Sequence, residues 1–190
     1  MKFIASISAV IATGALTASA DVATGPTWGY RTSDTSMVHT SNWNTNWAAC
    51  GGAHQSPINI VTTANPTNRL RWTLREIGPK SDDWLGPVLD ALELVNSTTH
   101  SKAIVVNLKS YSTMVRQAAS IGGIYNYAGS LTTPGCEENA DWWVVQNPIK
   151  ISSIDFGRLH QDLVEYQITD DGDNARPVQP LNGRVVTRYN

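Results

Sequence analysis

The sequence predicts a mainly β domain with two helices, and three observations favour this class. Several short segments are rich in β-branched and aromatic residues, as strands are. Only two segments repeat apolar residues at helical spacing. Seven of the 190 residues are Trp and only two are Phe, and Trp suits β-rich packing or a binding surface. Because no internal repeat or low-complexity linker interrupts the chain, we expect one domain.

The first twenty residues have the pattern of a secretory signal peptide. Lys2 precedes an uncharged apolar stretch, and Ala18-Ser19-Ala20 is an A-x-A cleavage site. A membrane anchor is the alternative, but the apolar stretch is shorter than the roughly 18 residues that a span requires. We therefore expect a signal at 1–20, a mature domain at 21–190, an extracellular location and no membrane partner.

The next elements are expected from local pattern. Residues 21–56 are rich in Ser, Thr, Asn, Gly and Trp without a sustained period, which indicates an irregular arm laid across a surface. Strands are expected at five short apolar or β-branched runs: 57–61, 103–108, 142–146, 149–151 and 184–188.

The two helices are expected near 83–95 and after 153. In the first, Ser81, Asp82 and Asp83 offer N-caps, and Pro87 suits the first turn. In the second, we expect Ser153 to be the cap, and three apolar residues share one face: Phe156, Leu159 and Leu163.

The charge balance excludes one class of partner. Charged residues make up 16% of the chain against 41% hydrophobic residues, and the 14 Lys and Arg form no basic run. A protein that binds a nucleic-acid backbone normally shows a basic stripe. We expect no nucleic-acid partner.

Residue spacing alone yields no active site. The four histidines form no H-x-H, H-x-x-H or H-E-x-x-H pair, and each is better interpreted as exposed or hydrogen-bonded; they are His39, His54, His100 and His160. The chain also contains no G-x-S-x-G, phosphate-binding loop or dinucleotide-binding motif.

Two further features follow from an oxidising compartment. Cys50 and Cys136 either pair or remain two unrelated buried thiols. Asn96-Ser97-Thr98 is a glycosylation acceptor, used if it is exposed.

Three longer segments carry a family resemblance. Cys50–Ile60 reads CGGAHQSPINI, Tyr127–Pro134 reads YAGSLTTP, and Asn174–Arg184 reads NARPVQPLNGR. In this order they closely resemble the α-class carbonic anhydrases. The resemblance implies an antiparallel sheet with peripheral helices, and zinc-dependent reversible hydration of carbon dioxide to bicarbonate. Cys50 and Cys136 match the disulfide of the secreted members.

The resemblance also assigns individual residues. Thr132 matches the threonine that accepts a hydrogen bond from zinc-bound hydroxide. Leu131 and Trp142 match parts of the wall of the carbon dioxide pocket, and Thr133 matches a residue at the substrate site. Gly135 departs from the family, which usually has a second proline there.

One stretch of the family pattern is absent. The three zinc histidines of the family lie between the QSPINI block and the helix before the SLTTP block, an interval that is greatly shortened here around residues 72–78. We therefore expect a truncated domain without its central strands, no bound zinc and no activity, Thr132 being vestigial.

Two alternatives remain open. One is a non-catalytic secreted binding module, with a protein partner held through exposed Trp residues of the arm. The other is an active enzyme with His39, His54 or His100 as substitute ligands.

Overall fold

The computed structural model describes residues 26–61, 69–70, 76–83, 85–94, 112, 116, 120, 122–146, 150–165 and 168–189. The expected signal at 1–20, the strand at 103–108, Asn96 and His100 lie outside these residues.

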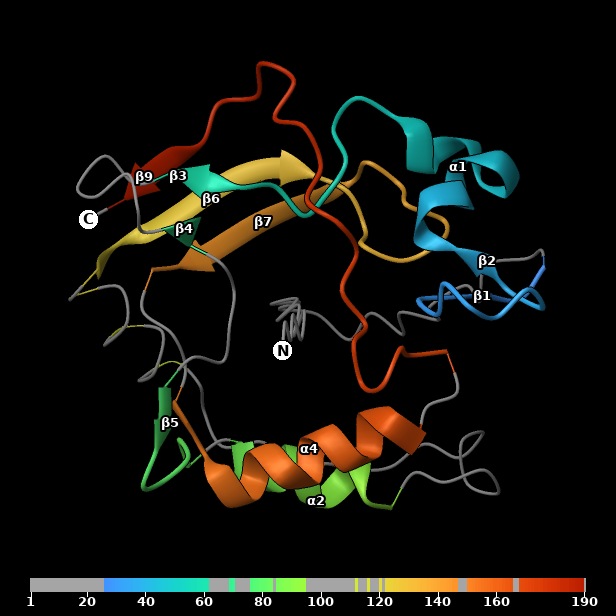
Figure 1. The fold of residues 1–190 in the computed structure, drawn as a ribbon. Helices are drawn as coiled ribbons and strands as arrows, with labels where there is room; N and C mark the ends of the chain where they lie inside the picture. The colour runs from blue at the N-terminus through green and yellow to red at the C-terminus, as the bar shows by residue number, and fades with distance from the viewer. Residues whose placement is uncertain are drawn as a thin grey trace.

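The largest sheet consists of three antiparallel strands in the order β7-β6-β9 (Figure 1). They are β6 (Ile124–Gly129), β7 (Ala140–Val145) and β9 (Thr187–Tyr189). Side chains alternate between its two faces, so Tyr125, Tyr127 and Val144 are buried on one face, where they pack with Ile58 and Ile60. The fold is therefore mainly β, as the sequence predicts.

Three pairs of short strands surround this sheet. β1 (Trp28–Gly29) pairs parallel with β2 (Val38–His39), and β3 (Ile60–Val61) pairs antiparallel with β4 (Arg69–Leu70). β5 (Glu76–Gly78) pairs parallel with β8 (Lys150–Ser152). Short strand pairs of both orientations thus accompany the antiparallel sheet.

Two helices lie side by side, apart from the three-stranded sheet (Figure 1). They are α2 (Leu85–Leu92) and α4 (Ser153–Glu165), and both fall within the predicted segments. Leu85, Leu89 and Leu159 form a buried cluster with Ile151 of β8. The periodic apolar residues of each helix therefore face the other helix and the β5–β8 pair.

The N-terminal cap of α4 differs by one residue from the prediction. The Ser152 hydroxyl, not that of Ser153, accepts a hydrogen bond from the Asp155 amide at 3.1 Å. Ser152 also donates to the Asp155 carboxylate at 2.9 Å. Ser152 is the last residue of β8, so the strand leads directly into the helix, which leaves Ser153 inside the first turn.

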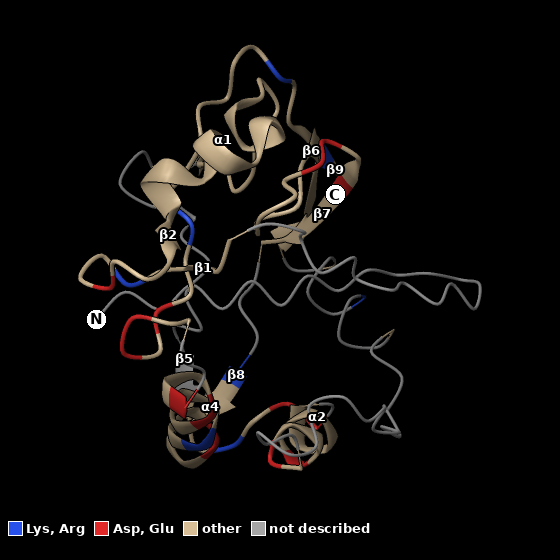
Figure 2. Ribbon diagram, turned by 90° about the vertical axis from the view of Figure 1, so that its right-hand side faces the viewer, with Lys and Arg blue, Asp and Glu red and all other residues tan. Residues whose placement is uncertain are grey.

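Charges of both signs occur on the helical layer. Figure 2 shows acidic and basic segments close together on α4. Arg158 donates to Asp90 at 2.7 Å and to Glu93 at 2.6 Å, so that it joins α4 to the end of α2. The hydrogen bond from Arg158 holds the pKa of Glu93 below its ordinary range. The pKa of Asp155 is also lowered, chiefly by a hydrogen bond from Ser81.

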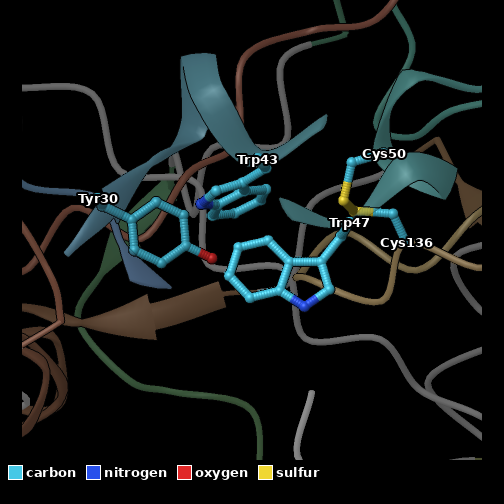
Figure 3. Close-up of a cluster of buried hydrophobic side chains, with 5 residues drawn as sticks. All are labelled: Tyr30, Trp43, Trp47, Cys50 and Cys136. Carbon is cyan, nitrogen blue, oxygen red and sulfur yellow. A yellow bond between two sulfur atoms is a disulfide. The ribbon is translucent and has the colours of Figure 1, made fainter. Parts of the chain in front are cut away.

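The arm is more regular than predicted. It contains the helical turns η1 (Thr40–Asn42), α1 (Trp43–Asn46) and η2 (Ala48–Gly51), in addition to β1 and β2. Trp43 and Trp47 are buried with Tyr30 and the two cysteines (Figure 3). The expectation of exposed arm tryptophans is therefore wrong for these two residues. The Trp43 ring packs edge to face with Trp28 and Tyr30, and Trp47 is buried in the same cluster.

The strand predictions differ from the structure mainly at their ends. The predicted strands at 57–61, 142–146, 149–151 and 184–188 correspond to β3, β7, β8 and β9 with shifted ends. The last one begins later, at Thr187, and the Arg184 amide donates instead to the Leu181 carbonyl at 3.1 Å in a turn. The sequence did not predict five of the strands: β1, β2, β4, β5 and β6. Among the described residues, no helix has the length and apolar content needed to cross a membrane.

Candidate functional site

The candidate site is the first part of the loop between β6 and β7, residues 130–136, which carries three of the four residues assigned from the family. Its first residue is anchored to the QSP segment by reciprocal hydrogen bonds. The Ser56 amide donates to Ser130 Oγ at 2.9 Å, and the Ser130 amide donates to Ser56 Oγ at 3.1 Å. Both serines are fully buried. Two segments 74 residues apart thereby hold each other in place.

Tyr127 completes this contact from the sheet. Its hydroxyl donates to Ser56 Oγ at 3.3 Å, and its ring stacks on Trp142 with a centroid distance of 6.3 Å. Burial raises the pKa of the Tyr127 hydroxyl, so the group stays protonated and can donate. The residue before the loop, Gly129, has no room for a side chain, because a Cβ there would overlap Ser56 and Trp142.

A buried arginine ties the C-terminal segment to the same region. Arg176 is 5% exposed, and it donates to the carbonyls of Cys50 and Ser56 at 2.9 Å each and to Gln55 Oε1 at 2.8 Å. Its guanidinium also lies 5.7 Å from the ring centroid of Trp43. Burial lowers the pKa of Arg176, but an arginine begins so high that it remains charged at neutral pH.

Glu138 fixes the other side of the loop. Its Oε1 atom accepts from the His54 amide at 2.7 Å and from Gln55 Nε2 at 2.8 Å. These bonds, chiefly the one from Gln55, hold the pKa of Glu138 below its ordinary value. Glu138 therefore acts here as an ionised acceptor that orders the QSP segment.

The tip of the loop is a tight turn centred on Pro134 and Gly135. The Cys136 amide donates to the Thr133 carbonyl at 2.9 Å, and Gly135 has a φ of +100°. This is the backbone pattern of a type II turn, which needs Gly at its third position. A proline, with φ near −65°, cannot adopt that angle. The departure at Gly135 therefore goes with a turn that the usual family residue could not form.

The disulfide between Cys50 and Cys136 is confirmed. It joins η2 of the arm to the end of the loop, with 4.9 Å between the Cα atoms (Figure 3). Cys136 is fully buried and Cys50 is 6% exposed. The loop is thus fixed at its start by Ser130 and at its end by Cys136.

The four assigned residues lie together on this loop and the adjacent strand. Leu131 is 43% exposed and its amide donates to the Glu137 carbonyl at 3.1 Å. Thr132 and Thr133 are half-buried. Trp142, from β7, donates through its indole nitrogen to the Ser130 carbonyl at 3.0 Å. The structure therefore brings them together, while the roles of the individual residues remain predictions.

The described histidines do not fit a zinc site. His39 bonds within its own turn to Ser41 at 3.2 Å, His54 Nδ1 lies 4.0 Å from Glu138, and His160 stacks against Phe156 on α4. Within the part of the chain that the structure describes, no three His, Cys, Asp or Glu side chains are grouped to hold a metal ion.

The residues that organise the loop were not singled out by spacing. Ser56, Ser130, Gln55 and Arg176 are all within the three quoted blocks, and a long literal match to a family was the signal that could have found them. Nothing local to the sequence shows that Arg176 contacts residues about 120 positions earlier.

Comparison with known proteins agrees with this geometry. The eukaryotic-type carbonic anhydrase family model matches residues 72–190. The chain belongs to the α-class carbonic anhydrase family. The α-carbonic anhydrase of Photobacterium profundum shares the fold, with a TM-score of 0.52 and 20% identity over 84% of this chain and 99% of that one.

Among curated relatives, the chain is 31% identical to rat carbonic anhydrase 4 over 115 residues, or 60% of this chain and 37% of that protein. It is 45% identical to bovine carbonic anhydrase 6 over 62 residues, or 33% and 19% of the respective lengths. The chain therefore spans well under half the length of these relatives.

Proposed function

We propose that this chain is a secreted member of the family that binds no stoichiometric zinc and does not hydrate carbon dioxide. The observation that carries the proposal is the placement of the described histidines. His39, His54 and His160 lie in three separate parts of the chain, and each has another partner. The sequence supports the same conclusion, since it contains no H-x-H pair.

The chemistry explains why missing ligands would abolish activity. In this family zinc supplies a hydroxide near neutral pH, whereas free water has a pKa near 15.7. Thr132 accepts or donates a hydrogen bond, Leu131 presents an apolar surface, and Trp142 is held by Ser130. None of these groups is a base that could replace the missing nucleophile. The loop residues assigned from the family therefore cannot supply the reacting group.

Metal analysis and stopped-flow hydration on the purified chain test this proposal. We expect less than stoichiometric zinc after dialysis against zinc, and a rate equal to that of the buffer. Thr132→Ala serves as a matched variant, since it should change nothing in an inactive chain. One zinc per chain, with turnover that a chelator abolishes and Thr132→Ala lowers, would refute the proposal. The variants His39→Ala, His54→Ala and His100→Ala would then identify substitute ligands.

We further propose cleavage after Ala20 and a single mature domain at 21–190. The apolar N-terminal stretch and the disulfide, which persists in oxidising compartments, support it. Expression in a secreting host followed by intact-mass analysis checks it. Protein retained in cells with residue 1 still attached would contradict it. The same mass measurement shows whether Asn96 carries a glycan.

A non-catalytic binding module is the second candidate. Trp143, on β7, is 54% exposed. Its exposure favours a binding surface on the sheet, whereas the sequence predicted one on the arm. A cooperative melting transition without zinc would support a folded module, whereas a non-cooperative one would support an unstable truncated product.

A further inference from the structure

The three-stranded sheet has an open face opposite its buried one. We call it the outer sheet face and define it by Asp141 and Trp143 of β7, Asn126 of β6, and Thr187 and Tyr189 of β9. Asn126 lies opposite both Trp143 and Thr187 in the strand register. Asp141 contacts Asn126 and Trp143, and Trp143 contacts Tyr189, so these side chains share one surface. The strand register places Thr187 on the same face.

Two exposed aromatic rings meet on this face. Trp143 is 54% exposed and Tyr189 is 48% exposed. Their ring centroids are 5.3 Å apart and their planes are tilted by 32°. Aromatic rings carry a partial negative charge on their faces, which attracts cations. The outer sheet face thus presents a paired aromatic surface to solvent.

A carboxylate is held rigidly beside the rings. Asp141 Oδ2 accepts from the Trp143 indole nitrogen at 2.7 Å, and Oδ1 accepts from Asn126 Nδ2 at 2.6 Å. Asn126 Nδ2 also donates to the Trp142 carbonyl at 3.2 Å. A carboxylate has about four acceptor positions, so Asp141 retains capacity for a further donor or cation.

The charge of the outer sheet face is negative. Asp141 is the only charged residue among the five that define the face, as the structure describes it. Arg188, the basic residue of β9, lies with its guanidinium 6.0 Å from the ring centroid of Tyr125, which belongs to the buried face. The Arg188 guanidinium is therefore turned away from Trp143 and Asp141.

From this arrangement we propose that the outer sheet face binds a small organic ammonium ion. The cation would lie over the exposed Trp143 ring, with Asp141 beside it supplying the counter-charge. A quaternary ammonium suits the site because its methyl groups contact the ring while its charge remains close to the carboxylate. This inference is independent of the proposed lack of hydration activity, since it uses no residue of the loop at 130–136.

Choline and its neutral isostere 3,3-dimethyl-1-butanol provide a matched pair of probes. The readout is the NMR shift of the Trp143 indole N–H, assigned by its loss in Trp143→Phe. We expect saturable shifts with choline and none, or much weaker ones, with the neutral isostere. Added salt should weaken choline binding, because the contribution of an exposed charge is screened.

Two variants test whether choline binding depends on the charge of Asp141. Asp141→Asn keeps the size of the side chain and should weaken choline binding about threefold or more. Glu137→Gln, which changes an exposed acid between residues 130–136 and β7, is the control and should leave binding unchanged. Circular dichroism of each variant confirms that the sheet is intact.

Equal shifts with choline and the isostere would overturn the proposal. So would the absence of saturable binding, an equal effect of Glu137→Gln, or binding of a neutral sugar in place of choline.

Discussion

Replacing Arg176 by Met is expected to destabilise the domain strongly. The side chain is 5% exposed and supplies three hydrogen bonds, two of them to the backbone carbonyls of Cys50 and Ser56. Methionine keeps the apolar stem and removes every donor. The carbonyls of Cys50 and Ser56 would then be left in the interior without these partners.

The magnitude follows from those two carbonyls. Each buried acceptor left unsatisfied costs about 1–3 kcal/mol, which gives roughly 2–6 kcal/mol for the pair. Removing a buried charge returns part of that cost, because its desolvation penalty disappears. We therefore expect a net loss of about 3 kcal/mol, a large part of a typical total of about 5–15 kcal/mol.

Urea unfolding of the oxidised protein, followed by circular dichroism, measures the change by linear extrapolation. Arg116→Met is the control, because Arg116 is exposed and bonds only within its own segment to Ser112 among the contacts described. The free energy of unfolding of this control should lie within about 0.5 kcal/mol of that of the parent.

Arg176→Lys adds a second arm to the experiment. A lysine keeps the charge but lacks the planar fork that reaches several acceptors at once, so we expect an intermediate loss. If the free energy of unfolding of Arg176→Met lies within about 0.5 kcal/mol of that of the parent, Arg176 does not stabilise the segment at Gln55 and Ser56 as argued.

Three further predictions concern other contacts of the same fold. Replacing Cys50 and Cys136 by Ala should lower stability by up to about 4.5 kcal/mol, because the bond closes a loop of 86 positions; non-reducing urea titration measures it, and an unchanged midpoint would contradict it. The hydrogen bond from Gln55 holds the pKa of Glu138 below its ordinary value, so the stabilisation by this carboxylate is present above the ordinary glutamate pKa and is lost as pH falls through the lowered pKa. Glu138→Gln should flatten the fall of stability at acid pH, and an unaltered fall would exclude this role. Leu89→Ala should cost about 2–5 kcal/mol, since Leu89 is fully buried; a change in melting temperature indistinguishable from zero would show that the helical layer packs loosely.

Local sequence was sufficient where one segment determines its own conformation. The helical spacing of Leu89 and Leu92 and the β-branched run in β7 predicted elements that the structure contains. The predicted caps and ends of the elements were less accurate. Ser152 caps α4 because its hydroxyl bonds both the amide and the carboxylate of Asp155. The sequence alone does not distinguish Ser152 from the adjacent Ser153 for this role.

The family resemblance reached further than spacing. It led to the Cys50–Cys136 pair, which the structure contains, and to the loop that gathers Leu131, Thr132 and Thr133 beside Trp142. Long literal matches can do this because a family preserves contacts between distant segments, whereas periodicity reports only the face of one element.

Tertiary structure alone decided which polar and aromatic side chains are buried. Trp43 stands between two asparagines in the sequence and Trp143 stands between Trp142 and Val144. Yet Trp43 is fully buried and Trp143 is 54% exposed. Arg176 lies in a Pro-rich segment that carries no mark of burial, but it bonds to Cys50, 126 positions away. Composition and spacing determined the β class, the two helices and the lack of an H-x-H pair. The partners of Arg176 and the exposure of Trp143 depend on which distant segments pack together, and no local pattern encodes that packing.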